Sequence, residues 1–161
     1  MKIQERLKKY INENLEVLEQ FNECSIFLGQ EQPKRARASK VNITDYIDNN
    51  REESFQTKLF ELIDKKGLKD SDVYNKVNID RRLFSKIRNN NYHPSKETVI
   101  LLGLSLELTE KEIEELLKSA SYSLPKNNTF DLIIRFCFLE KIYDINVVND
   151  FLYEYNCKTL I

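Results

Sequence analysis

The sequence predicts an all-α protein, and three observations lead to that fold class. Apolar residues recur at three- and four-residue steps through most of the 161-residue chain, which is the spacing of one face of a helix. Only 3 Gly and 3 Pro occur, too few turn residues for a sandwich of many strands. Residues that cap helices also precede many of the apolar segments. We therefore expect an N-terminal amphipathic helix, a five-helix domain and two further helices.

Residues 1–28 are predicted to form the N-terminal amphipathic helix. Its apolar stripe consists of Ile3, Leu7, Tyr10, Ile11, Leu15, Leu18 and Phe21. A single helix cannot bury such a stripe alone, so it either docks on the remaining helices or pairs with a second copy of the chain. Residues 29–53 follow as a basic linker and a short helical turn around Ile43, Tyr46 and Ile47.

The first two helices of the five-helix domain have recognisable boundary residues. Ser54 is a helix cap and begins the first helix, which Gly67 ends. The second helix is predicted over residues 68–77, with Asp70 or Ser71 as its cap.

Three more helices complete this domain, which spans residues 54–119. Asp80 caps the third helix, after Asn78, a residue type that tolerates positive φ. Ser95 caps the fourth helix, and a capping box that begins at Thr109 opens the fifth. Residues 120–161 form the C-terminal extension, with two amphipathic helices.

Positive charge gathers in the middle of the chain. The formal net charge is only -1, but residues 54–106 carry ten Lys or Arg against six Asp or Glu, and residues 107–161 carry six against ten. The linker adds Lys34, Arg35 and Arg37 with no neighbouring acid. A basic middle between acidic ends suits a polyanionic partner. Solvated helix faces with a chance imbalance of charge are the alternative.

Several classes of protein are disfavoured by composition. Cys24, Cys137 and Cys157 are odd in number and far apart, which favours free thiols in a reducing cytoplasm. One His and no close pair of Cys argue against a structural zinc site, and neither a metal nor a cofactor is predicted. No apolar run approaches the ~18 residues that would cross a bilayer, so no membrane partner is predicted.

The stretch 68–106 contains two short helices joined by a tight turn. Their apolar spacing fixes each helix against the other, so that the second helix protrudes. The residues with this spacing are Val73, Val77, Ile79, Phe84 and Ile87. A protruding helix can enter the major groove of DNA, which is about 12 Å wide.

Residues 67–88 (GLKDSDVYNKVNIDRRLFSKIR) and 94–99 (PSKETV) carry a family resemblance. Residues 54–106 resemble the lambda-repressor/Cro-like helix-turn-helix domain. Residues 54–161 also resemble, over their whole length, a little-characterised group of bacterial helical domains, in which the pattern of residues 78–88 recurs. Some members of that group are fused to unrelated enzymatic domains.

The first resemblance implies a recognition helix that contacts base edges. By position, its contact residues are Arg81, Arg82, Ser85 and Lys86. Phosphate would be contacted by Lys76, Arg88, Lys96 and the amides at the start of the second helix. The predicted function is therefore that of a non-catalytic transcriptional regulator that binds double-stranded DNA as a homodimer.

The basic linker has two interpretations. Lys34, Arg35 and Arg37 could enter an adjacent minor groove as an arm. A flexible connector whose charge keeps it solvated is the alternative.

A protein–protein interaction or adaptor module, with the helix-turn-helix as scaffold, is the alternative function. The second helix begins Asp70-Ser71-Asp72, whose carboxylates would repel a DNA backbone. Tyr74 stands where the family has a small residue, so the two helices are wedged further apart or the ring points outward. The acidic, aromatic region 107–161 suits a protein partner.

No catalytic site is predicted. Residues 88–93 fit the Arg-polar-x-x-x-His pattern of the helical HEPN ribonucleases, with Arg88 and His93 at its ends. The same residues lie in the loop between the third and fourth helices, so ribonuclease activity is a third hypothesis. Cys137 lies in a nearly continuous apolar stretch and is predicted to be buried and inert.

Overall fold

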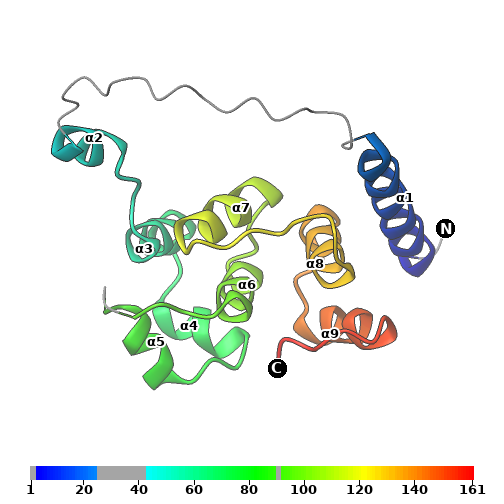
Figure 1. Cartoon of the computed structure of the whole chain (residues 1–161). Coiled ribbons are helices and arrows are strands. Elements are labelled where there is room, and N and C mark those ends of the chain that lie inside the picture. Colours follow the sequence, from blue (N-terminus) through cyan, green and yellow to red (C-terminus); the bar gives the residue numbers. More distant parts are fainter. Residues whose placement is uncertain (1–2, 25–42, 90–91) are drawn as a thin grey trace, which may run out of the picture.

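The computed structural model describes residues 3–24, 43–89 and 92–161, and it confirms the all-α fold class (Figure 1). The helices are α1 (Ile3–Cys24), α2 (Ile43–Asn50), α3 (Phe55–Lys66), α4 (Asp70–Lys76), α5 (Arg81–Ile87), α6 (Lys96–Ser105), α7 (Glu110–Ser119), α8 (Thr129–Leu139) and α9 (Ile145–Glu154). The described ranges contain no strand. None of their helices combines the length and apolar character that crossing a lipid bilayer requires.

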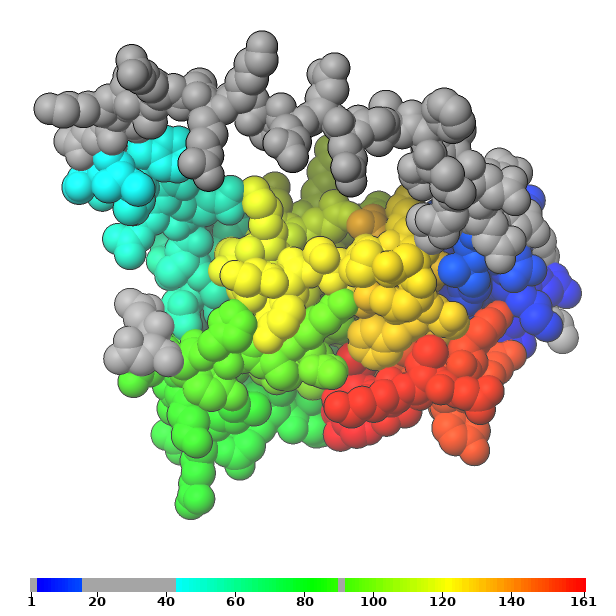
Figure 2. All heavy atoms as spheres, viewed as in Figure 1, coloured from blue at the N-terminus to red at the C-terminus, as the bar shows by residue number. Residues whose placement is uncertain are grey.

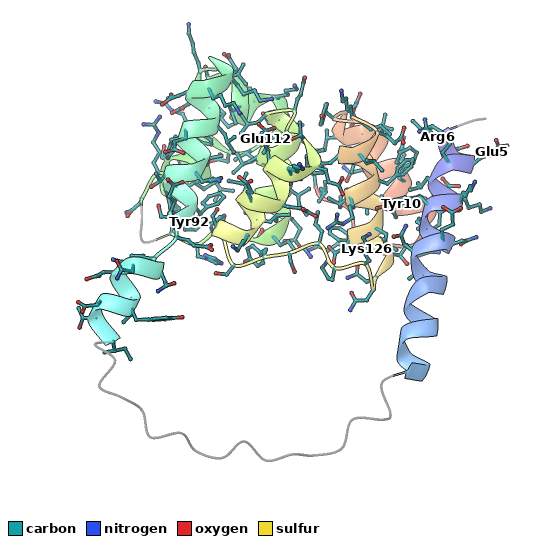
Figure 3. All side chains as sticks on the ribbon, turned by 90° about the horizontal axis from the view of Figure 1, so that it is seen from above. Glu5, Arg6, Tyr10, Tyr92, Glu112 and Lys126 are labelled. Atoms are coloured by element: carbon teal, nitrogen blue, oxygen red, sulfur yellow. The ribbon has the colours of Figure 1, made fainter. Side chains whose placement is uncertain are left out.

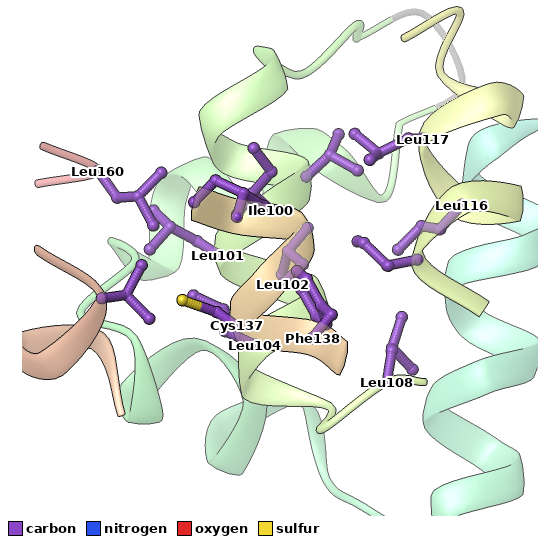
Figure 4. Packing of buried hydrophobic residues seen from close by; sticks show 14 of the residues in the cluster. Ile100, Leu101, Leu102, Leu104, Leu108, Leu116, Leu117, Cys137, Phe138 and Leu160 are labelled. Atoms are coloured by element: carbon purple, nitrogen blue, oxygen red, sulfur yellow. The ribbon is translucent and has the colours of Figure 1, made fainter. Parts of the chain in front are cut away.

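Helix α6 is the centre of the fold. Every residue from 99 to 105 is buried, and a helix without a polar face must be covered on all sides. It packs against α4 and α7. Gly103 lets two neighbours come close, because a Cβ atom there would overlap Ile113 of α7 and lie 3.2 Å from Phe138 of α8. Figure 4 shows this packing from nearby.

One cluster of buried apolar side chains extends from Leu7 in α1 to Leu160 after α9. It crosses residue 119, the predicted end of the five-helix domain, so that boundary does not separate two cores. Cys137 lies within the cluster and is fully buried, as predicted. Burial raises the pKa of its thiol to about 12, so the nucleophilic thiolate is not formed at neutral pH.

The N-terminal helix α1 docks on α8, which is one of the two outcomes that its stripe predicts. Leu7 is fully buried. The ring of Tyr10 lies 5.6 Å from that of Phe136, and Nη2 of Arg6 lies 2.5 Å from Oε1 of Glu140. Figure 3 shows Arg6 and Tyr10 on α1. The helix therefore adds apolar contact to the core and an exposed ion pair beside it.

Most helix boundaries follow the predicted capping residues. Ser54, Asp80 and Ser95 each accept hydrogen bonds from backbone N–H groups two or three residues later. Thr109 opens α7 with the predicted capping box. Gly67 ends α3 in the left-handed conformation, with φ 64°, which glycine adopts without steric cost.

The start of α4 differs from the prediction. The helix begins at Asp70, its N-cap residue is Lys69, and it ends at Lys76. The caps predicted at Asp70 and Ser71 are therefore wrong. The carboxylate of Asp72 accepts a hydrogen bond from the Lys69 N–H at 3.3 Å. A carboxylate three residues into a helix can satisfy this N–H group from inside the first turn, whereas the Lys69 side chain accepts no hydrogen bond from the helix.

Candidate nucleic-acid interface

Helices α4 and α5 are two short helices joined by the turn 77–80. Asn78 has φ 53°, the left-handed conformation that the sequence predicts it to tolerate. The carboxylate of Asp80 then accepts a hydrogen bond from the Arg82 N–H at 2.6 Å and begins α5. The turn therefore needs no glycine.

Packing fixes this pair against the core. Val73, Phe84 and Ile87 are buried, and the Ser105 hydroxyl of α6 donates a hydrogen bond to the Val73 carbonyl at 2.6 Å. The ring of Tyr74 is half-buried, with its centroid 5.5 Å from that of Phe84. Tyr74 therefore fills the contact between the two helices instead of projecting into water.

Helix α5 leaves its basic side chains on the surface. It buries Phe84 and Ile87, and it lies at the lower edge of the molecule in Figure 1, with the green atoms of this region at the same edge in Figure 2. The residues predicted to contact base edges are all exposed, namely Arg81, Arg82, Ser85 and Lys86. The Ser85 hydroxyl donates a hydrogen bond to the Arg81 carbonyl at 3.0 Å.

Most basic side chains of residues 54–106 outside α5 are held by partners within the protein. Ion pairs join Lys58 to Glu115, Lys65 to Glu112, Lys76 to Glu107, Arg88 to Asp70 and Lys96 to Asp131. Arg81, Arg82 and Lys86 have no acidic partner among the described residues. Charge that is not neutralised internally is available to an external anion.

The predicted phosphate contacts are engaged elsewhere. Lys76, Arg88 and Lys96 all belong to the ion pairs above. Asp131 is almost fully buried, and its Oδ1 lies 2.6 Å from Nζ of Lys96. The Arg88 guanidinium also lies over the Phe60 ring, 4.7 Å from its centroid. These side chains would therefore contact a DNA phosphate only with the N–H donors that their partners leave, since an ammonium group has three donors and a guanidinium five.

Four more basic residues bear on this interface. Lys34, Arg35 and Arg37 of the proposed minor-groove arm lie outside the described residues. Lys69 was not predicted, yet it is exposed at the N-cap of α4 and lacks an acidic partner in the described ranges. The sequence pattern placed it inside the helix, so the position gave no signal.

A hollow of about 540 Å³ lies between the start of α4 and α5. Asp64 and Asp70 line it together with Arg81 and Arg88, and Tyr74 contributes an aromatic wall. The lining therefore carries charges of both signs. Neither a histidine nor a cysteine lines it.

The residues of the ribonuclease hypothesis have different partners. Arg88 is bound to Asp70, whereas the exposed His93 has its ring 5.4 Å from that of Tyr122. No contact between Arg88 and His93 occurs in the described structure. The described residues also contain no group of three or more His, Cys, Asp or Glu side chains that could hold a metal ion.

Comparison of the chain with protein-family models, with curated proteins and with solved structures found no match. The exposed basic side chains of α5 are then the structural feature that indicates a function.

Proposed function

We propose that this chain is a non-catalytic DNA-binding protein, a transcriptional regulator in which α4 and α5 act as the helix-turn-helix and α5 as the recognition helix. The observation that carries the proposal is the exposed charge of Arg81, Arg82 and Lys86, on a helix at the edge of the fold. None of the three has an acidic partner in the part of the chain that the structure describes. Neighbouring lysines and arginines are mostly paired within the protein.

The spacing on α5 suits a groove-binding helix. Arg82 and Lys86 are four residues apart, as are Arg81 and Ser85, so each pair shares one side of the helix. An arginine fork can bind both acceptors of a guanine in the major groove, and lysine supplies a compact charge to phosphate or guanine.

The acidic start of α4 is less unfavourable for DNA than its sequence suggests. Asp70 is paired with Arg88, so its charge is balanced within the protein. Asp72 is turned toward the Lys69 N–H. The ion pair of Asp70 therefore weakens the repulsion between this carboxylate and a DNA backbone, and that repulsion is what favours a scaffold function.

A homodimer is part of the proposal. One α5 contacts only a few base pairs, and a two-fold pair of recognition helices would contact half-sites about 34 Å apart along the duplex. The expected target is therefore an inverted repeat.

Fluorescence anisotropy with a random, AT-rich duplex pool tests the proposal at two salt concentrations. We expect binding that weakens steeply as salt rises, since cations released from the duplex drive association. Lys86→Ala should weaken binding and reduce the salt slope by about 1. Lys111→Ala, an exposed lysine of α7, is the matched control and should leave both unchanged.

Arg82→Ala separates the recognition of a specific base from electrostatic attraction to any duplex. If Arg82 contacts a guanine, its loss should cost about 1–3 kcal/mol on a selected site and less on the random pool. Absence of binding at low salt, or equal losses for Lys86→Ala and Lys111→Ala, would contradict DNA binding through α5.

A protein-interaction function is the second candidate, and exposed apolar side chains favour it. Helix α2 has no buried residue, and Ile43, Tyr46 and Ile47 are 71%, 62% and 53% exposed. In the C-terminal region most rings are covered, but Tyr153 is 79% exposed. A protein partner retained after nuclease treatment, and lost with Ile47→Asp, would favour this candidate over DNA binding.

A further inference from the structure

A second hollow, of about 460 Å³, lies beside the first and carries a different balance of charge. Lys66 from the end of α3, Lys76 from the end of α4 and Lys141 from the turn after α8 line it. Glu107 is its one lining carboxylate. Three ammonium groups against one carboxylate leave a net charge of +2.

Two of these ammonium groups converge on one residue. Nζ of Lys76 lies 2.5 Å from Oε1 of Glu107, and Nζ of Lys66 donates a hydrogen bond to the Glu107 carbonyl at 3.2 Å. Hydrogen bonding to Lys76 and its charge hold the pKa of the Glu107 carboxyl below its usual value. Glu107 itself has φ 50°, and this backbone conformation places it at the turn after α6.

The lining of this hollow has more hydrogen-bond donors than acceptors. An ammonium group has three N–H donors. Lys66 and Lys76 each donate to one acceptor, and Lys141 donates to none among the described residues. The three hydroxyls of the lining all donate within the protein: Tyr143 to the Leu108 carbonyl, Ser105 to the Val73 carbonyl and Thr109 to the Glu112 carboxylate. Surplus N–H donors and net positive charge favour an oxyanion.

The hollow is large enough for a ligand bigger than a single phosphate group. Its volume falls within the range of about 300–1,000 Å³ that is usual for small-molecule sites. Leu68 and Leu106 add apolar lining beside the lysines, which would suit a ligand with an organic portion next to its charge. Leu68 also lines the hollow at α5, so the two hollows are neighbours.

We propose that this lysine-lined hollow binds a small molecule with a diphosphate group, such as a nucleoside diphosphate. Its net charge of +2 complements the charge of the diphosphate, and its ammonium groups reach the hollow from three separate elements. The proposal does not depend on DNA binding by α5.

Isothermal titration calorimetry on the full chain, with inorganic pyrophosphate and with ADP as probes, tests the proposal. The double variant Lys66→Ala/Lys141→Ala removes two ammonium groups that take part in no ion pair within residues 3–24, 43–89 and 92–161, so the fold should be retained. We expect its affinity for pyrophosphate to fall at least about tenfold, because hydrogen bonds to charged groups are lost. Lys65→Ala is the matched control, since Lys65 is paired with Glu112 outside the hollow.

Glu107→Gln provides a test of opposite sign. It removes the one negative charge of the lining while keeping a side chain of similar shape, and pyrophosphate should bind several-fold more tightly. ADP should bind at least as tightly as pyrophosphate.

Three results would overturn the proposal. One is the absence of pyrophosphate binding, and another is equal affinity in the wild type, the double variant and Glu107→Gln. The third is displacement of pyrophosphate by a random duplex whose own binding requires Lys66 and Lys141, because the hollow would then be a contact for nucleic-acid backbone.

Discussion

Helices α5 and α8 both carry arginine, and Arg82 of α5 and Arg135 of α8 have opposite surroundings. The Arg135 side chain of α8 is 15% exposed, pairs with Glu110 at 2.6 Å and is also bound by Glu114. Arg82 of α5 is exposed and has no acidic partner in the described ranges. The partners of an arginine, and not its residue type, therefore decide whether it stabilises the fold or is available to another molecule.

The same contrast holds for the whole of each helix. Seven of the eleven residues of α8 are buried, whereas two of the seven residues of α5 are buried. Stability should therefore depend strongly on α8, and changes on the outer side of α5 should leave it almost unchanged. The variants below test this contrast, and those expected to lose most stability come first.

Phe138→Ala should have the largest effect. Phe138 packs at the centre of the core beside Gly103, and removing its ring should lower the free energy of unfolding by about 3–5 kcal/mol. The half-buried Leu83 of α5 is the counterpart. Leu83→Ala should cost only about 1 kcal/mol, because the side chain removed was never fully withdrawn from water. Urea unfolding measures both, and equal losses would contradict the contrast between the helices.

Asp131→Ala should come second. It leaves the ammonium of Lys96 half-buried beside the core without its partner, and we expect a loss of about 2–3 kcal/mol, because an uncompensated charge remains. Asp150→Ala, at an exposed position of α9, is the control and should change stability by less than about 0.5 kcal/mol. Thermal unfolding should separate the two variants clearly. Similar melting temperatures would show that the Lys96–Asp131 pair contributes little.

Arg135→Ala and Arg82→Ala compare the two arginines directly. Losing Arg135 removes hydrogen bonds to two carboxylates, which should cost about 1–2 kcal/mol. Losing Arg82 should change stability by no more than about 0.5 kcal/mol. Guanidinium is unsuitable as a denaturant here because it is itself a salt, so urea is used. A larger loss for Arg82 would mean that α5 has structural contacts for its charge.

Glu112→Gln should have the smallest effect, and one that depends on pH. Glu112 accepts a hydrogen bond from the Thr109 N–H at 2.9 Å, and this bond and the Thr109 hydroxyl lower the pKa of its carboxyl from the usual 4.5. Because the pKa of the Glu112 carboxyl is lower in the folded than in the unfolded state, its charge stabilises the fold at any pH above the unfolded pKa. This stabilisation is lost as the pH falls through the folded pKa.

At pH 7 the Gln variant should therefore be less stable by about 0.5 kcal/mol, since Gln still accepts the bond but lacks the charge. The difference from wild type should narrow below pH 4.5. Glu61→Gln, at an exposed position of α3, serves as the control. A difference that stays constant between pH 7 and pH 3 would contradict this assignment.

Local features of the fold could be predicted because they depend on neighbouring residues. Caps at Ser54, Asp80 and Ser95, the stop at Gly67 and the left-handed Asn78 each follow from a few adjacent side chains. The start of α4 could not, because Asp72 satisfies the Lys69 N–H from inside the helix. Asp70, Ser71 and Asp72 are all residue types that can accept hydrogen bonds from the first N–H groups of a helix, and the sequence does not show which of them does so.

The pairing of charges at the candidate site could not be predicted. Arg88 and Asp70 are 18 residues apart, and Lys96 and Asp131 are 35 apart. Such pairs form only when packing brings distant segments together, and no periodic pattern marks them. The exposure of Arg81, Arg82 and Lys86 agrees with the helical spacing of α5. Their lack of acidic partners within the described ranges depends on how distant segments pack.

The ion pair between Arg88 and Asp70 joins the end of α5 to the start of α4. The chain from residue 70 to residue 88 is thereby closed on itself, with both helices and the turn inside the closed segment. A change in the angle between the two helices would then have to break this ion pair as well as their apolar contact, and an exposed pair adds about 0–1 kcal/mol. The angle is therefore held at the helix ends as well as at the turn that contains Asn78.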